Sequence, residues 1–137
     1  MYKNILLAAD GSDNSFRAAE ESLNFINGET EITIINVIDA ETSKNDVLHS
    51  SPSESIIHKR KEKLAKIVEL YETNKISCNI RFEHGTPNET VVSAANSGSY
   101  QLVVLGSRGL NTLQEMVMGS VSHKVAKRSN IPVVIVK

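Results

Sequence analysis

One segment of the sequence has residue types and a glycine spacing that suit the binding of a ligand. It reads Gly106-Ser107-Arg108-Gly109, then nine residues, then Gly119-Ser120. Glycines let the backbone take positive φ and let a ligand approach the main chain, and successive N–H groups can surround an anion. A helix beginning at Gly119-Ser120 would add free N–H groups and the favourable end of its dipole. Arg108 could supply a cation and Ser120 a hydroxyl donor. The segment therefore predicts a phosphate-binding site, although Gly106 and Gly109 alone also suit an ordinary turn.

Short apolar runs mark the strands that must hold this segment. Four of them are continuous and stop at Gly, at Asp or near the end of the sequence, which is typical of strands buried on both faces of a parallel sheet. The run from Ile76 to Phe82 alternates instead, so it predicts a half-exposed strand nearer an edge. The four buried strands are expected at Ile5–Ala9, Ile32–Ile38, Leu102–Leu105 and Val133–Val136.

Helical patterns fill the intervals between these runs. Ser12, Ser51-Pro52-Ser53-Glu54 and Thr86-Pro87-Asn88-Glu89 are start signals, and Gly119-Ser120 opens the last helix. Lys59-Arg60-Lys61 is predicted to be a solvated helix face. The buried stripes are expected at Phe16, Ala19, Leu23 and Ile26; at Ile57, Leu64, Ile67, Val68 and Tyr71; at Val91, Val92, Ala94 and Ala95; and at Val121, Val125 and Ala126.

The alternation of strands and helices predicts a single α/β domain over residues 1–137. We expect an open five-stranded parallel sheet of strand order 3-2-1-4-5 with helices on both faces. Winding reverses between strands 1 and 4, and ligands of open α/β sheets bind in that crevice. Asp10 ends strand 1 and Gly106 ends strand 4, so the two should lie side by side. Asp10 could accept from ribose hydroxyls, or it could only cap the first helix.

These residues resemble the universal stress protein family over the whole length. Its ATP-binding subgroup carries Gly-x-x-Gly-x9-Gly-Ser/Thr, which Gly106, Gly109, Gly119 and Ser120 match. Lys3-Asn4-Ile5-Leu6 through Asp10-Gly11-Ser12, Asn36-Val37-Ile38-Asp39 and Val104–Gly109 are also similar, with Asn36 where many relatives have His. The resemblance implies a Rossmann-like fold, similar to adenine nucleotide alpha hydrolases, with ATP between strands 1 and 4, Val37 on the base, a homodimer and a stress role. The implied nucleotide site is Ala8, Ala9, Asp10, Val37, Gly106, Ser107, Arg108, Gly109, Gly119, Ser120, Val121 and Ser122.

Composition and charge limit the kinds of molecule that the protein is expected to bind. The formal net charge of -1 gives no electrostatic case for nucleic acid or an anionic membrane. One cysteine, Cys78, suits a reducing compartment, and no apolar stretch approaches the ~18 residues of a membrane span, so we expect a cytoplasmic protein. The four histidines lack helical ligand spacing, so we predict no protein metal site, although Mg²⁺ carried by the phosphates remains open.

Two further segments have alternative interpretations. Val133–Val136 is an apolar run that can form an edge strand, and such edges invite pairing with another chain. With the family resemblance, this favours a homodimer built on antiparallel pairing of Val133, Val134, Ile135 and Val136, although the shortness of the strand and Lys137 could protect it. Ala40 to Ser50 is polar and Ser-rich, so it is either a disordered loop or a ligand lid.

The leading functional hypothesis is a dimeric ATP-binding module whose nucleotide state sets its partner interactions. No general base and no arginine finger is evident, so we assign no catalytic residue and expect at most slow hydrolysis. The alternatives are a small ATP-using enzyme of the same fold and a family member that dimerises without nucleotide. A phospho-acceptor domain is disfavoured because Ala8 and Ala9, not acids, precede Asp10.

Overall fold

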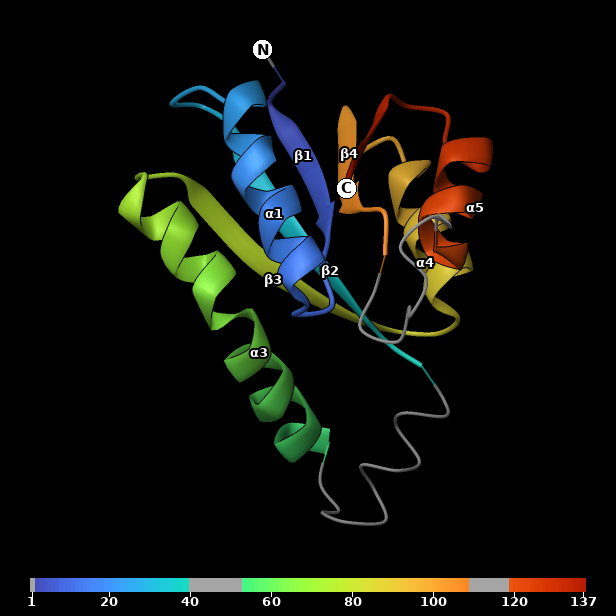
Figure 1. Ribbon diagram of the computed structural model, residues 1–137, viewed down its shortest axis with the longest axis horizontal. Helices are drawn as coiled ribbons and strands as arrows, with labels where there is room; N and C mark the ends of the chain where they lie inside the picture. The colour runs from blue at the N-terminus through green and yellow to red at the C-terminus, as the bar shows by residue number, and fades with distance from the viewer. Residues whose placement is uncertain (1, 40–52, 109–118) are drawn as a thin grey trace.

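The computed structural model describes residues 2–39, 53–108 and 119–137 (Figure 1). Strands and helices alternate along the chain, as predicted. The elements, in order, are β1 (Asn4–Ala8), α1 (Asp13–Ser22), the 3₁₀ turn η1 (Leu23–Phe25), β2 (Glu31–Ile38), α3 (Ser53–Thr73), β3 (Ser77–His84), α4 (Pro87–Ala95), β4 (Leu102–Gly106), α5 (Ser120–Arg128) and β5 (Val133–Val136).

The five strands form one parallel sheet in the order β3-β2-β1-β4-β5, which confirms the predicted topology. Ala8 is in register with Ile35 on one side and with Leu105 on the other. The carboxyl ends of β1, β2 and β4 therefore meet at the same edge of the sheet. β3 lies at one border of the sheet, as its alternating pattern indicates.

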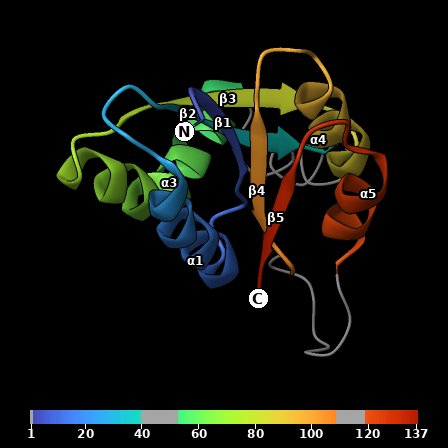
Figure 2. The same cartoon turned by 90° about the horizontal axis from the view of Figure 1, so that it is seen from above.

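Two helices cover each face of the sheet, with α1 and α3 on one side and α4 and α5 on the other (Figures 1 and 2). Ile5 and Leu7 pack toward α1 and α3, whereas Leu6 packs toward α4 and α5. All three side chains are fully buried. Because β1 is buried on both faces, neither face carries polar side chains, and its sequence is a continuous apolar run.

The first helix starts where the sequence predicts it and ends earlier. The Ser12 hydroxyl accepts a hydrogen bond from the Ser15 N–H at 3.1 Å, so Ser12 is the N-cap. The stripe drawn through Leu23 and Ile26 was wrong about length, because α1 ends at Ser22 and η1 follows. A tighter 3₁₀ turn is a common way for a helix to finish.

The long helix α3 buries the predicted stripe except at its first position. Leu64, Ile67 and Tyr71 are buried as expected, but Ile56 is buried in place of Ile57, which is half-buried. The start signal at Ser51-Pro52 lies outside the described residues. Residues four apart share a helix face, so the buried side of α3 runs from Ile56 through position 60 to Leu64.

The phenol of Tyr71 joins α3 to α1. Tyr71 is fully buried, and its hydroxyl lies 2.7 Å from the Ser22 hydroxyl. Ser22 donates its own proton to the Ala19 carbonyl, so Tyr71 acts as the donor toward Ser22. Burial raises the pKa of Tyr71 well above its ordinary value, which keeps this donor protonated.

We expect Tyr71→Phe to lower the free energy of unfolding by about 1 kcal/mol, since it removes one buried hydrogen bond while keeping the ring. Tyr71→Ala should cost about 3–5 kcal/mol because it also opens a cavity. Urea denaturation at neutral pH measures both values. Tyr2→Phe, at a half-buried tyrosine of the same sheet face, is the control. A Tyr71→Phe protein as stable as the wild type would contradict this role.

Candidate functional site

A cavity of about 490 Å³ opens at the carboxyl ends of β1, β2 and β4. Its volume falls within the range of about 300–1,000 Å³ that is usual for small-molecule sites. Gly109 lies outside the described residues. The other eleven residues of the predicted nucleotide site all line the cavity: Ala8, Ala9, Asp10, Val37, Gly106, Ser107, Arg108, Gly119, Ser120, Val121 and Ser122.

One end of the cavity is formed by the start of α5 folded against the end of β4. The carbonyl of Ser107 accepts from the Gly119 N–H at 2.6 Å and from the Ser122 hydroxyl at 3.1 Å. Gly119 is the N-cap of α5 and makes no side-chain capping bond. The N–H groups of the next three residues therefore have no partner within the helix and carry the positive end of its dipole. This end of the cavity is suited to an anion.

The glycines serve a purpose other than the positive φ expected from the sequence. Gly119 has φ -64°, and the described glycines with positive φ are Gly11, Gly85 and Gly98. A Cβ on Gly119 would lie 3.0 Å from the Ser107 carbonyl oxygen. Gly119 therefore allows the main chain at the start of α5 to pack closely against the main chain of Ser107, which a residue with a Cβ would prevent.

Gly106 makes room for the side chain of Asn14. A Cβ on Gly106 would lie 2.6 Å from the Asn14 Cγ and even closer to its Oδ1. Asn14 Oδ1 accepts from the Arg108 N–H at 2.6 Å, and Asn14 Nδ2 donates to the Val136 carbonyl at 3.0 Å. The Ser107 N–H also donates to Val136, at 2.8 Å. The buried carboxamide of Asn14 thus ties the turn after β4 to the end of β5.

Asp10 lines the cavity between the end of β1 and the start of α1. Its Oδ1 accepts from the Ser12 N–H at 2.9 Å, so it holds the turn before α1, whereas the N-cap of that helix is Ser12. A carboxylate accepts several hydrogen bonds, so this bond is compatible with a ligand contact. The following residue, Gly11, has φ +88°, and a Cβ there would lie 2.8 Å from the Lys63 Cβ. Only glycine fits this turn at its closest approach to α3.

The other end of the cavity is formed by the main chain of Val37. In β2, Glu31 and Ile35 bond to β1, so the odd-numbered residues turn their N–H and C=O toward that strand. The register of β1 with β2 stops at Ala8 and Ile35, and the Ala9 N–H makes the last bond. Val37 is the next residue of β2 whose main chain points toward β1, but the pairing of the two strands has already ended there. Its N–H and C=O face the crevice beyond the end of that strand.

Arg60 also reaches this end of the cavity, and the prediction that Lys59-Arg60-Lys61 is a solvated face was wrong for its middle residue. Lys59 and Lys61 are exposed, but Arg60 is half-buried and lines the cavity. Its Nη1 donates to Asn36 Oδ1 at 2.9 Å and to the Val37 carbonyl at 3.2 Å. The spacing would have revealed it, because Arg60 is four residues from both Ile56 and Leu64 on the buried stripe.

The remaining lining residues were not predicted either. They come from the ends of strands and from helix faces that the glycine motif does not include. Asn36 Nδ2 donates to the Ala9 carbonyl at 2.9 Å, so this side chain connects β2 to β1. The cavity wall thus combines cations from α3 and the β4 turn with acids from β1 and β2. The added residues are Ser15, Ile35, Asn36, Asp39, Arg60, Lys63, Pro87, Val91 and Leu105.

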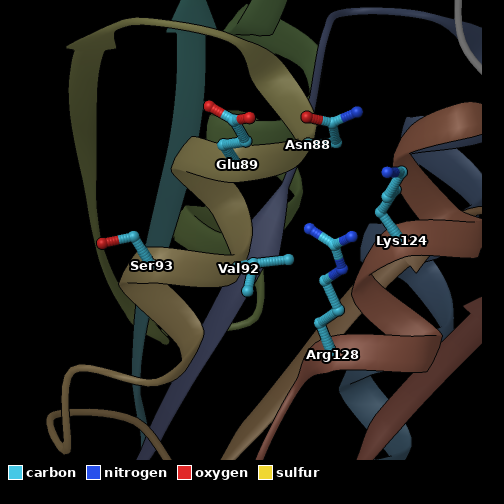
Figure 3. A pocket seen from close by; sticks show the side chains of 6 residues that line it. All are labelled: Asn88, Glu89, Val92, Ser93, Lys124 and Arg128. Carbon is cyan, nitrogen blue, oxygen red and sulfur yellow. The ribbon is translucent and has the colours of Figure 1, made fainter.

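A second and smaller hollow lies between α4 and α5 (Figure 3). Its volume is about 180 Å³, and Lys124 and Arg128 of α5 face Asn88 and Glu89 of α4 across it. It lies away from the carboxyl ends of the central strands and includes none of the predicted site residues. At this volume the hollow is smaller than usual ligand pockets.

Neither a metal-binding cluster nor a membrane-spanning helix is present among the described residues. No group of three or more His, Cys, Asp or Glu side chains is placed to hold a metal ion there. No helix among those residues is both long enough and apolar enough to cross a membrane.

Comparison with known proteins gives one consistent family. The model of the Universal stress protein family matches residues 1–137. Universal stress protein YxiE of Bacillus subtilis is 29% identical, with 100% of both chains covered. The solved structure of the hypothetical protein MJ0577 has a TM-score of 0.85 at 28% identity and covers 100% of this chain and 96% of its own. A universal stress protein in complex with cAMP has a TM-score of 0.75 at 22% identity, covering 99% and 97%.

The contact between Gly106 and Asn14 can be tested by a double-mutant cycle. We expect Gly106→Ala to cost about 1–3 kcal/mol in the wild type, since the new methyl group collides with the Asn14 carboxamide. The same change in an Asn14→Ala background should cost less, giving a coupling energy of about 1–2 kcal/mol.

Urea unfolding of the four proteins supplies the measurement. Gly28→Ala is the matched control, because a Cβ on Gly28 has nothing within 4 Å. Equal costs of Gly106→Ala in both backgrounds would show that the two residues do not share this space.

Proposed function

The chain belongs to the universal stress protein family, and from this premise we propose that it binds an adenine nucleotide, ATP, in the cavity at the carboxyl ends of β1, β2 and β4. The observation that carries the proposal is one cavity with two unlike ends. The start of α5, which has no side-chain cap, forms one end, and the main chain of Val37 beyond the end of the β1 register forms the other. Asp10 lines the same cavity. These three features suit the phosphates, the base and the ribose of a nucleotide, respectively.

The phosphates belong at the start of α5. The N–H groups of Ser120, Val121 and Ser122 precede the first intrahelical donor, the N–H of His123, and helix N-termini of this kind bind phosphate. Arg108 adds a positive charge from the turn after β4. If Mg²⁺ accompanies ATP, the phosphates would carry it, and the hydroxyls of Ser107 and Ser120, which line this wall, could supply neutral oxygen ligands.

The base belongs against Val37. An exposed main-chain N–H beside a C=O complements a ring nitrogen that accepts and an amino group that donates, which adenine presents at N1 and C6. Val37, Val91 and Pro87 supply apolar wall around it. The complex of a family member with cAMP supports an adenine nucleotide as ligand. Asp10 then accepts from the ribose hydroxyls.

Binding rather than turnover is the activity that we propose. Fast phosphoryl transfer requires a group that positions the nucleophile and a cation on the developing charge, and neither role is assigned to a residue of this cavity. The nucleotide state would then set the interactions of one cytoplasmic domain with its partners, and any hydrolysis would be slow.

We also propose that the protein is a homodimer joined through β5. Val133, Val134, Ile135 and Val136 are each half-buried, and β5 borders the sheet. The carbonyls of Pro132 and Val136 bond to β4 and its turn, so Val133 and Ile135 direct their N–H and C=O outward. Antiparallel pairing with a second copy would satisfy this apolar edge.

Nucleotide binding can be tested with a pair of matched substitutions. We expect saturating ATP to raise the melting temperature of the wild type, as ligand linkage requires. Asp10→Asn should weaken ATP binding about tenfold or more, because a charged acceptor for the ribose hydroxyls is lost. Asp13→Asn removes the same charge at an exposed position of α1 and should leave the affinity unchanged.

Isothermal titration calorimetry with ATP, AMP and cAMP gives the dissociation constants. A melting temperature unmoved by all three nucleotides would end the proposal. A wild-type affinity retained in Asp10→Asn would remove Asp10 from the site while leaving nucleotide binding intact.

The dimer can be tested at Ile135, whose N–H points away from β4. Ile135→Pro removes this outward donor and leaves the bonds to β4 in place. We expect the wild type to sediment at twice the chain mass of 15.0 kDa and the variant to sediment at the chain mass. A far-ultraviolet spectrum like that of the wild type would show that the variant is folded. A monomeric wild type, or a folded variant that stays dimeric, argues against pairing through β5.

A further inference from the structure

The carbonyl of Val37 is already engaged by Arg60. Nη1 of Arg60 donates to it at 3.2 Å and to Asn36 Oδ1 at 2.9 Å. Asn36 in turn donates from Nδ2 to the Ala9 carbonyl. The guanidinium is therefore held at the end of β2 by two bonds, one of them to a side chain that is itself fixed.

A second observation comes from the other nitrogen of this group. The Nε atom of Arg60 is buried and has no hydrogen-bond partner within the part of the chain that the structure describes. A buried unsatisfied donor is costly, and such atoms call for an explanation in terms of function. Guanidinium has five N–H donors and no acceptor. The guanidinium beside Val37 therefore has more donors than the described residues have acceptors for it.

This arrangement alters what the base would meet. A main-chain carbonyl alone attracts the 6-amino group of adenine. A carbonyl that bonds to a cation attracts it less, because the amino hydrogens and the guanidinium carry charge of the same sign. A purine with an oxygen at C6 carries a proton on N1 and loses the match to the Val37 N–H, but it gains the guanidinium donors, which pair with O6 and N7 of such bases.

We propose that Arg60 determines the base selectivity of this site by reducing its preference for 6-amino purines over 6-oxo purines. The inference rests on the proposed function, because it concerns the base of a nucleotide bound in the same cavity. Arg60 acts partly through the Val37 carbonyl and partly through its own donors. It differs in this from residues that hold the phosphates, which add the same affinity to every nucleotide.

The test compares ATP with ITP, which carries oxygen in place of the amino group, in the wild type and in Arg60→Met. We expect wild-type dissociation constants within about threefold of each other and a preference for ATP of about tenfold or more in Arg60→Met, where the main-chain edge discriminates alone. Lys59→Met is the control, since it removes the same charge from an exposed neighbour on α3 and should leave the ratio as in the wild type.

A second measurement needs no variant. Purine riboside triphosphate lacks the 6-amino group and is otherwise ATP, so the wild type should bind it no more than about threefold more weakly than ATP. A wild-type preference of tenfold for ATP over this analogue, or over ITP, would overturn the proposal. An Arg60→Met protein whose affinities for ATP and ITP fall by the same factor would also overturn it, since that pattern indicates a purely structural role. Binding of no nucleotide at all would remove the proposed function and this inference together, whereas the preceding outcomes remove the inference alone.

Discussion

The early end of β1 is the constraint on which the rest of the site depends. Its last bond to β2 runs from the Ala9 N–H to the Ile35 carbonyl, while β2 continues to Ile38 against β3. Beyond that rung the chain turns through Gly11 at φ +88° to enter α1. The turn leaves a gap at the edge of the sheet, and the main chain of Val37 borders it. Because β4 lies on the other side of β1, the turn after β4 borders the same gap. A cavity at this place follows from strand order and strand length, before any side chain is considered.

Side chains then fix the walls of that gap. Asn14 joins the turn after β4 to Val136, and Arg60 joins α3 to the end of β2. Both bonds link segments far apart in the sequence, and both come from the helices that cover the same face. The turn after β4 is therefore linked to the Val136 carbonyl twice, directly by the Ser107 N–H and through the Asn14 carboxamide. If β5 pairs with a second copy, ligand and partner act on neighbouring ends of the same hydrogen-bonded connection.

The sheet order and the helix positions were predicted from apolar runs and start signals, and eleven of the residues that line the cavity were predicted from the glycine spacing together with the family resemblance. It missed Asn14 and Arg60 for different reasons. Asn14 has partners 94 and 122 residues away, so nothing local marks it. Arg60 could have been found, because it lies four residues before buried Leu64, but grouping it with its exposed neighbours Lys59 and Lys61 assigned it to solvent. Gly106 and Gly119 do not have the positive φ that was one of the two expected reasons for glycine; each makes room for a neighbouring group of the protein, and spacing cannot distinguish these needs.

The two ends of the cavity differ in whether main chain or side chains determine their hydrogen-bonding groups. At the start of α5 the donors are main-chain N–H groups, so any chain that keeps Gly119 and the fold keeps them. At the end of β2 the main chain offers a similar edge, but here Arg60 and Asn36 modify it, and neither belongs to the glycine spacing. Two chains with the same spacing can therefore hold the same phosphates and still differ in the base that they accept. Family membership rests on the match over residues 1–137, whereas in our proposal the choice of nucleotide depends on side chains from α3 and β2.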